Sequence, residues 1–286
     1  MRNVLPILTV VAALVVLWYG AAIWLNAPWA HDQAKRAGVE LSFSEVVADT
    51  WAQDKPRLPA PHQVVAEIWK TTVQKSITSK RSLIFHSWIT MSATVLGFAL
   101  GTALGFALAI GIVYNRVMDM SVMPWVIASQ TIPILAIAPM IIVVLNAVGI
   151  SGLLPKAMIS MYLSFFPIVV GMVKGLRSPD AMQLDQMRTW NASRTQEFWK
   201  LRLPSSMPYL FTSMKIGMAA SLVGAIVGEL PTGAVAGLGA RLLAGSYYGQ
   251  TIQIWSALFM AAGLAAVLVG IIGILQRTAL KRMGMA

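Results

Sequence analysis

Long apolar runs alternate with short polar segments along most of this chain, and the runs have the length of membrane-spanning helices. A helix needs about 20 mostly apolar residues to cross the hydrocarbon core of a bilayer. Six runs are candidates: residues 4–25, 89–113, 120–148, 155–173, 207–227 and 252–275. The pattern predicts an all-α integral membrane protein with about six transmembrane helices.

The third run is the longest of the inner ones, and prolines interrupt it. Pro124, Pro133 and Pro139 divide its residues. Proline removes a backbone donor and clashes with the preceding turn, so a helix bends or breaks there. We expect this span to be kinked or split.

The remaining segments give the domain organisation. Residues 1–25 are expected to be a retained N-terminal membrane anchor, because their apolar stretch exceeds the core of a signal peptide. Residues 26–85 are expected to form an external loop, in which residues 62–73 have the apolar spacing of a short amphipathic helix. Residues 86–280 form the predicted five-span core, with a polar loop at 174–206, and residues 281–286 form a tail.

Charge gives the expected orientation. Hydrophobic residues make up 57% of the chain and charged residues 12%, with a net charge of +11. Short loops on the cytoplasmic side of membrane proteins carry an excess of lysine and arginine. If the N-terminus is inside, six basic residues between positions 174 and 202 are inside, whereas the short outside loops carry only Lys156 and Arg241. Both termini are therefore predicted to be cytoplasmic.

Four polar residues in or beside the runs are candidates for a solute pathway. Ser129, Gln130 and Thr131 precede Pro133, and Glu229 ends the fifth run. Polar groups inside a membrane are costly and often mark a functional site. Two interpretations stay open: these side chains line a pathway, or they satisfy the proline kink locally and cap a helix end at the membrane face.

A stripe of small residues in the second run predicts close helix packing. Gly97, Gly101 and Gly105 recur every four residues. Glycines on one helix face let another helix approach closely in lipid. The partner helix belongs either to this subunit or to a second one.

Several kinds of chemistry are missing. There is no Gly-Lys dipeptide and hence no Walker A loop for ATP, no G-x-S-x-G motif, and no cysteine. The histidines His31, His62 and His86 lack zinc-ligand spacing. We expect no catalytic site, cofactor or metal in this chain. If the chain moves a solute uphill, the energy has to come from a partner.

The loop between the fourth and fifth runs is expected to form a helical hairpin. Residues 180–190 form its first helix, Asn191 suits a left-handed turn, and Ser193 begins a capping box with Gln196. Pro204 and Pro208 are expected to stop the second helix before the next span.

The hairpin carries Phe198 and Trp199, which we expect to be exposed. Exposed aromatic side chains on such a loop are interpreted in two ways. The hairpin either docks a partner protein or rests on lipid headgroups as an ordinary amphipathic loop.

Spacing within this loop resembles the signature of bacterial ABC-importer permeases. That signature has E-A-A, three residues, G, nine residues and I-x-L-P. Here the same intervals hold Asp185-Gln186-Met187, then Asn191, then Leu201-Arg202-Leu203-Pro204. The similarity extends over about residues 55–280 and includes TIPILAIAP at 131–139 and GLG at 237–239. The LPAP at 58–61 resembles the LPSP start of nitrate/sulfonate/taurine-type permeases.

The resemblance implies a permease subunit in the bacterial inner membrane. Its implied partners are a dimer of cytoplasmic ABC ATPase subunits, a second permease copy or a paralogous permease, and an external solute-binding protein. ATP and Mg would be bound by the ATPase. The hairpin would be the coupling element. The coupling residues carried over are Asp185, Arg188, Asn191, Ser193, Arg194, Glu197, Phe198, Leu201, Leu203 and Pro204.

This chain departs from the signature at its small residues. Gln186 and Met187 replace both alanines, and Asn191 replaces the glycine. Larger residues imply an altered docking surface, and they raise the hypothesis of a degenerate subunit paired with a different permease. A secondary transporter or channel without an ATPase stays open as an alternative, as does a membrane-embedded enzyme.

The solute is suggested only by a second resemblance. Residues 228–250 look like permeases for pyrimidine-like compounds or nucleobase precursors. Sulfonates, taurine and nitrate stay open, because selection in such systems rests mainly with the binding protein.

Overall fold

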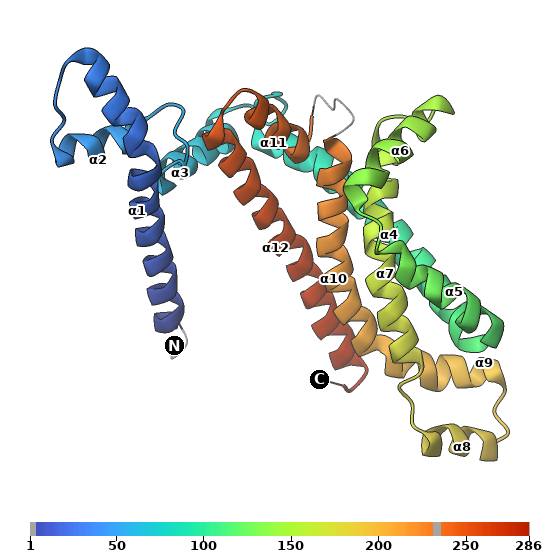
Figure 1. Cartoon of the computed structure of the whole chain (residues 1–286). Helices are drawn as coiled ribbons and strands as arrows, with labels where there is room; N and C mark the ends of the chain where they lie inside the picture. The colour runs from blue at the N-terminus through green and yellow to red at the C-terminus, as the bar shows by residue number, and fades with distance from the viewer. Residues whose placement is uncertain (1–3, 231–235, 286) are drawn as a thin grey trace. The chain divides into compact units, whose positions relative to one another are not determined.

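The described part of the chain, residues 4–230 and 236–285 of a computed structural model, is built from helices and contains no strand (Figure 1). The helices are α1 Val4–Ala37, α2 Phe43–Ala52, α3 Pro61–Trp69, α4 Leu83–Tyr114, α5 Arg116–Ser129, α6 Ile134–Ala147, α7 Leu153–Leu176, α8 Ala181–Thr189, α9 Arg194–Glu197, α10 Leu203–Glu229, α11 Leu238–Tyr247 and α12 Thr251–Arg282, with π-helical turns η1 Lys70–Gln74 and η2 Phe198–Arg202. The all-α prediction is confirmed.

The predicted spans correspond to long helices. Five helical stretches, containing α1, α4, α7, α10 and α12, are long and apolar enough to cross a membrane. The pair α5 and α6 makes a sixth if it counts as one span. This chain is a multi-pass membrane protein, as its apolar pattern predicts.

The proline-rich third run is split, as expected. Helices α5 and α6 meet at an angle of 100°. Pro133 precedes the first residue of α6, in extended conformation and without an N–H to continue the α5 ladder. Pro124 and Pro139 lie inside α5 and α6 without ending them. The break therefore falls at one of the three prolines.

The chain forms two compact units. The N-terminal unit contains the residues up to Ser87 together with Ala240–Ala261. The core unit contains Trp88–Gly239 together with the residues from Ala262 onward. The domain boundaries placed from the sequence stay a prediction.

A buried asparagine organises the N-terminal unit. Asn26 is fully buried, and its Oδ1 accepts hydrogen bonds from the backbone N–H groups of Arg57 and Leu58 at 2.8 and 3.2 Å. Its Nδ2 donates to the carbonyl oxygens of Thr50 and Leu58 at 3.3 and 2.8 Å. One amide thereby satisfies the backbone on both sides of the turn that leads to α3, as a buried polar group requires.

The segment after residue 25 is more helical than its polar composition indicates. α1 continues to Ala37 through Pro28, and α2 is an additional helix that the apolar pattern did not predict. Its signal is the S-x-x-E at Ser42, whose N–H donates to Glu45 Oε2 at 2.7 Å. The amphipathic helix expected at 62–73 is present as α3 and η1.

Small residues form the centre of the core unit, where α7 and α10 run side by side (Figure 1). A side chain at Gly171 or Gly175 of α7 would overlap Ser213 or Ser206 of α10. Ser160 Oγ of α7 donates to the Ser221 carbonyl of α10 at 2.7 Å. Close packing of this kind holds helices together in lipid, where the hydrophobic effect between them is absent.

The glycine stripe of α4 faces α7 within the same chain. A Cβ at Gly97 would lie 2.6 Å from the Ala157 carbonyl oxygen, and one at Gly105 would lie 2.9 Å from the Phe165 carbonyl oxygen. A Cβ at Gly101 would overlap Ser164 Oγ. The helix that packs against this stripe is therefore α7 of the same subunit, which is one of the two partners considered.

Candidate functional site: the helical hairpin between α7 and α10

The hairpin, residues 180–202, consists of α8, a turn, α9 and η2. Both limbs begin with a side-chain cap. Asp180 Oδ1 accepts the Gln183 N–H at 2.8 Å, and Ser193 Oγ accepts the Gln196 N–H at 3.3 Å. In each case the glutamine Oε1 accepts the N–H of the capping residue, at 3.2 and 2.9 Å. The S-x-x-Q box expected at Ser193 is confirmed, and each cap contributes about 1 kcal/mol to its helix.

Asn191 makes the turn between the limbs. Its φ of 50° is left-handed, and it is the only non-glycine residue with positive φ in the described ranges 4–230 and 236–285. The Asn191 N–H donates to the Arg188 carbonyl at 2.8 Å, and the Ala192 N–H donates to the Met187 carbonyl at 3.0 Å. These two bonds form a Schellman motif, which asparagine tolerates better than most residues. The replacement of glycine at this motif position therefore preserves the turn.

The second limb does not stop where we expected. Pro204 and Pro208 were predicted to end it, but helix continues from Arg194 to Glu229. η2 explains the difference, because the Leu203 N–H donates to the carbonyl of Phe198, five residues earlier. This wider turn leaves room for Pro204, which then stands in the first turn of α10, where a missing N–H is tolerated.

Arg202, at the base of the hairpin, bonds both to the hairpin and to the end of α7. Its Nε donates to Glu197 Oε1 at 2.5 Å, and its Nη1 donates to the carbonyl of Leu176, the last residue of α7, at 2.8 Å. Both charged side chains are only about a fifth exposed. The hairpin is therefore attached to α7 by this hydrogen bond, and it is continuous with α10. Arg202 lies at an unspecified position of the signature, so sequence reasoning did not single it out.

Two predicted contact residues are half-buried against the core. Phe198 and Leu203 pack against the hydrophobic core, and the Phe198 ring meets Tyr114 edge-on at 6.1 Å. Phe198, on a hairpin expected to be exposed, is only half-buried, and its ring lies against the core at the start of the π-helical turn. Trp199 is exposed as expected.

Three further predicted residues are exposed on the hairpin, and Leu201 faces the hollow between its limbs. Asp185 and Arg188 form an exposed ion pair at 2.9 Å, of a kind that contributes little to stability. Arg194 is exposed, and Leu201 is half-buried. Their roles in coupling stay a prediction.

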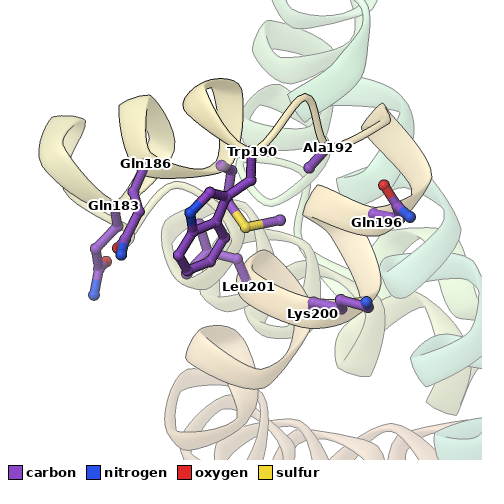
Figure 2. A pocket seen from close by; sticks show the side chains of 8 residues that line it. Gln183, Gln186, Trp190, Ala192, Gln196, Lys200 and Leu201 are labelled. Atoms are coloured by element: carbon purple, nitrogen blue, oxygen red, sulfur yellow. The ribbon is translucent and has the colours of Figure 1, made fainter.

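A hollow of about 420 Å³ opens between the limbs (Figure 2). It is lined by Gln183, Gln186, Met187, Trp190, Ala192, Gln196, Lys200 and Leu201. Figure 2 shows the Trp190 indole extending from the end of α8 toward Leu201. Trp190 is 67% exposed although it is large and apolar. Sequence reasoning missed Trp190, because its exposure depends on how the two limbs separate. Tryptophan is enriched among the residues that dominate binding energy at interfaces.

Gln186 and Met187, which replace the two alanines of the signature, both line this hollow. Amide groups offer donors and acceptors, and methionine adapts its shape to a partner. The two larger residues therefore place an amide and a thioether on a concave surface, at helical positions of α8.

The polar side chains at the break between α5 and α6 form local hydrogen bonds. Ser129 Oγ donates to the Val126 carbonyl at 2.7 Å, and Thr131 Oγ1 donates to the Ala128 carbonyl at 2.8 Å. Gln130 Nε2 donates to Ser129 Oγ at 3.2 Å. This geometry favours the local interpretation of these three residues, and their place in a solute pathway stays a prediction.

Glu229 belongs to a buried group at the start of α11. Its carboxylate is fully buried, accepts the Thr90 hydroxyl of α4 at 2.9 and 3.0 Å, and accepts the Gly239 N–H at 2.7 Å. Thr90 Oγ1 in turn accepts the Leu238 N–H at 2.9 Å. Glu229 thus caps the start of α11 from a buried position, and its place in a solute pathway stays a prediction. Pro231, beside which we expected this cap, lies outside the described residues.

In the parts of the chain that the structure describes, no three histidine, cysteine, aspartate or glutamate side chains gather as a metal site would require.

Comparison with known proteins gives a consistent set of matches. Residues 101–284 match the family described as binding-protein-dependent transport system inner membrane component. The chain is 32% identical over 220 residues to the riboflavin transport system permease protein RibX of Chloroflexus aurantiacus, covering 77% of this chain and 78% of the relative. It is 31% identical over 183 residues to the formylaminopyrimidine transport permease protein ThiX of Halalkalibacterium halodurans, covering 64% and 68%. It is 24% identical over 226 residues to the nitrate import permease protein NrtB of a Synechocystis species, covering 76% of each chain.

Proposed function

This chain belongs to the family of binding-protein-dependent transport system inner membrane components, and we propose that it passes a small solute, delivered by an external binding protein, through the membrane of an ATP-driven importer. As a member of that family it is an ABC-transporter permease, a transport subunit and not an enzyme. The proposal concerns its partners, its orientation and its solute.

The observation that carries the coupling proposal is the attachment of the hairpin. A continuous helix from Arg194 to Glu229 joins it to one span, and the bond from Arg202 to Leu176 joins it to another. A partner that displaces the hairpin would therefore move two packed spans together. Alternation between inward-open and outward-open states needs such a connection to the element that the partner pushes.

The proposed partner at the hairpin is a pair of cytoplasmic ATPase subunits, which would bind the ATP and Mg. The hollow around Trp190 would receive a side chain of the ATPase. This arrangement requires the hairpin and both termini to face the cytoplasm, as the distribution of basic residues also favours. A second permease, identical or paralogous, would complete the pathway.

The proposed solute is a pyrimidine-like compound or nucleobase precursor. Support comes from the names of two relatives above 30% identity, one for formylaminopyrimidine and one for riboflavin, both of which are nitrogen heterocycles. A relative at 24% identity is named for nitrate. Sulfonate, taurine and nitrate are the competing solutes.

The test of coupling starts from gentle purification of the tagged full chain in several mild detergents. We expect an ABC ATPase subunit to copurify, and the reconstituted complex to hydrolyse ATP faster when binding protein and solute are present. Solute flux from liposomes that contain this chain alone would contradict the proposal and favour a secondary transporter or channel.

The test of the solute uses cells that lack this chain. We expect them to lose uptake of a labelled formylaminopyrimidine and to recover it when the chain is restored. Normal uptake of that probe together with lost uptake of taurine or nitrate would overturn the solute assignment, while leaving the coupling proposal in place.

A further inference from the structure

A basic pocket of about 500 Å³ lies entirely within the N-terminal unit. Its walls come from α3, η1, the segment before α4, α11 and the start of α12. Four basic side chains line it, Lys70, Lys75, Arg81 and Arg241, against a single lining carboxylate, Glu67. Such a concave surface with excess positive charge attracts an anionic group.

Arg241, which is half-buried in this pocket, has one buried donor without a hydrogen-bond partner among the described residues. That donor is its Nε–H. Burial lowers the pKa of its guanidinium; nearby Glu67 raises that pKa, and Arg81 lowers it further. An unsatisfied buried donor on a charged group is costly, and an anion bound beside it would remove that cost.

An apolar hollow of about 960 Å³ adjoins the basic pocket. It lies between α1 and α3 and includes Val15, Tyr19, Val65 and Trp69. Lys70 lines both cavities. Charged and apolar binding surfaces therefore meet at one side chain.

The helix between the two cavities has the character of a membrane-surface helix. Val65, Trp69 and Val73 recur every four residues along α3 and η1, and all three are more than half exposed. Glu67, Lys70 and Thr71 lie at intervening positions and line the basic pocket. An amphipathic helix with tryptophan on its apolar face and lysine beside it is typical of the lipid–water interface.

We propose that these two cavities bind one anionic phospholipid. The headgroup phosphate would lie among Arg241, Arg81 and Lys70, and an acyl chain would lie in the hollow along Val15 and Trp69. The amphiphilic character of the combined site selects this occupant. A free inorganic anion leaves the apolar hollow unused, and an acidic protein side chain has no part to place in a hollow against α1.

The experiment titrates the purified full chain, with any subunits that copurify, with phosphatidylglycerol and with phosphatidylcholine, and counts bound lipids by native mass spectrometry. We expect tighter retention of phosphatidylglycerol. Arg241→Gln and Lys70→Gln should each weaken it about tenfold, since each removes a charged hydrogen bond. Trp69→Gln should also weaken retention of phosphatidylglycerol, because it removes an apolar contact with the acyl chain.

The matched control is Lys35→Gln combined with Arg36→Gln, two exposed basic residues in the last turn of α1 of the same unit. This control should retain phosphatidylglycerol like the unaltered chain. If Arg241→Gln does not fold, Arg81→Gln and Lys70→Gln carry the same expectation.

Three results would overturn the proposal. Equal retention of phosphatidylcholine would remove the headgroup selectivity, and equal losses in the control would show only a general effect of charge. Displacement of the lipid by millimolar inorganic phosphate, with no effect of Trp69→Gln, would identify a free-anion site.

Discussion

Polar side chains cap helix starts in two regions of the core unit. The two regions differ in the sequence separation between the capping side chain and the groups that it bonds. In the hairpin, Asp180 and Ser193 each cap a helix with a glutamine three residues away, in solvent. In the Glu229 node, formed by Glu229, Thr90, Leu238 and Gly239, the cap is buried and its partners come from α4 and α11.

Helix capping therefore has two different structural consequences in this unit. Caps between near neighbours form with the helix itself, so they survive when the hairpin moves as a body. A buried carboxylate that joins elements far apart in sequence fixes their positions, because every partner it loses becomes an unsatisfied buried group. The hairpin is thus suited to be displaced, and the node to resist displacement.

The largest expected effect is at the node. Glu229→Ala leaves the Thr90 hydroxyl and the Gly239 N–H without their acceptor, and we expect it to lower the free energy of unfolding by about 3–5 kcal/mol. The midpoint of thermal unfolding in detergent measures this. Asp185→Ala, which removes an exposed carboxylate from the hairpin, is the control and should cost less than about 1 kcal/mol.

Glu229→Gln refines this test because it keeps one acceptor and the shape of the side chain. We expect it to recover part of the stability. A Glu229→Gln protein that is stable but does not transport solute would support the predicted pathway role of this residue. Equal destabilisation by Glu229→Ala and Asp185→Ala would remove the distinction between the two regions.

The next effect is at the base of the hairpin. Arg202→Ala removes a largely buried charge pair with Glu197 and the bond to the Leu176 carbonyl. We expect a loss of about 2 kcal/mol in unfolding free energy, and a fall in the solute transported per ATP hydrolysed. The control is Arg116→Ala, an exposed arginine at the start of α5 that is not among the predicted coupling residues, which should leave both quantities nearly unchanged. A stable, fully coupled Arg202→Ala complex would contradict the proposed connection through α7.

A smaller, local effect is expected at a cap. Ser193→Ala should cost about 1 kcal/mol of local helix stability. We expect amide hydrogen exchange to accelerate about fivefold in residues 194–197, with little change in global unfolding. Thr195→Ala, two residues later, is the matched substitution. Faster exchange throughout α10 would show that the cap stabilises more than the hairpin.

The sequence predicted the elements whose causes are local or periodic. The spans follow from apolar length, the split third run follows from proline, and the hairpin turn follows from Asn191 and the Ser193 cap. These features depend on residues within one or two turns of each other. Periodicity and turn chemistry describe such distances well.

The features that the sequence did not predict depend on wider context. Pro204 was expected to end a helix, but a π-helical turn directly before it accommodates the missing donor, and Phe198 at the start of that turn lies against the core. The partners of Glu229 and Arg202 lie across helix pairs, so nothing in their own neighbourhood identifies them. The exposure of Trp190 likewise follows from the way in which the two limbs of the hairpin separate.

The smallest expected effect on stability, and the sharpest test of the hairpin, is at Trp190. Because its side chain is 67% exposed, Trp190→Ala should change the unfolding free energy by less than about 0.5 kcal/mol. If the hollow receives an ATPase side chain, the same change should weaken ATPase binding at least tenfold, since buried tryptophans dominate interface energies.

Met182→Ala is the matched control for Trp190→Ala. Met182 is 80% exposed on the same helix and does not line the hollow. ATPase retention on the immobilised permease separates the cases. Loss with Trp190→Ala alone places the contact in the hollow, whereas equal losses place it along α8 as a whole. Retention by both variants would show that the ATPase binds elsewhere on the hairpin, and the Gln186 and Met187 replacements would then lie outside the docking surface.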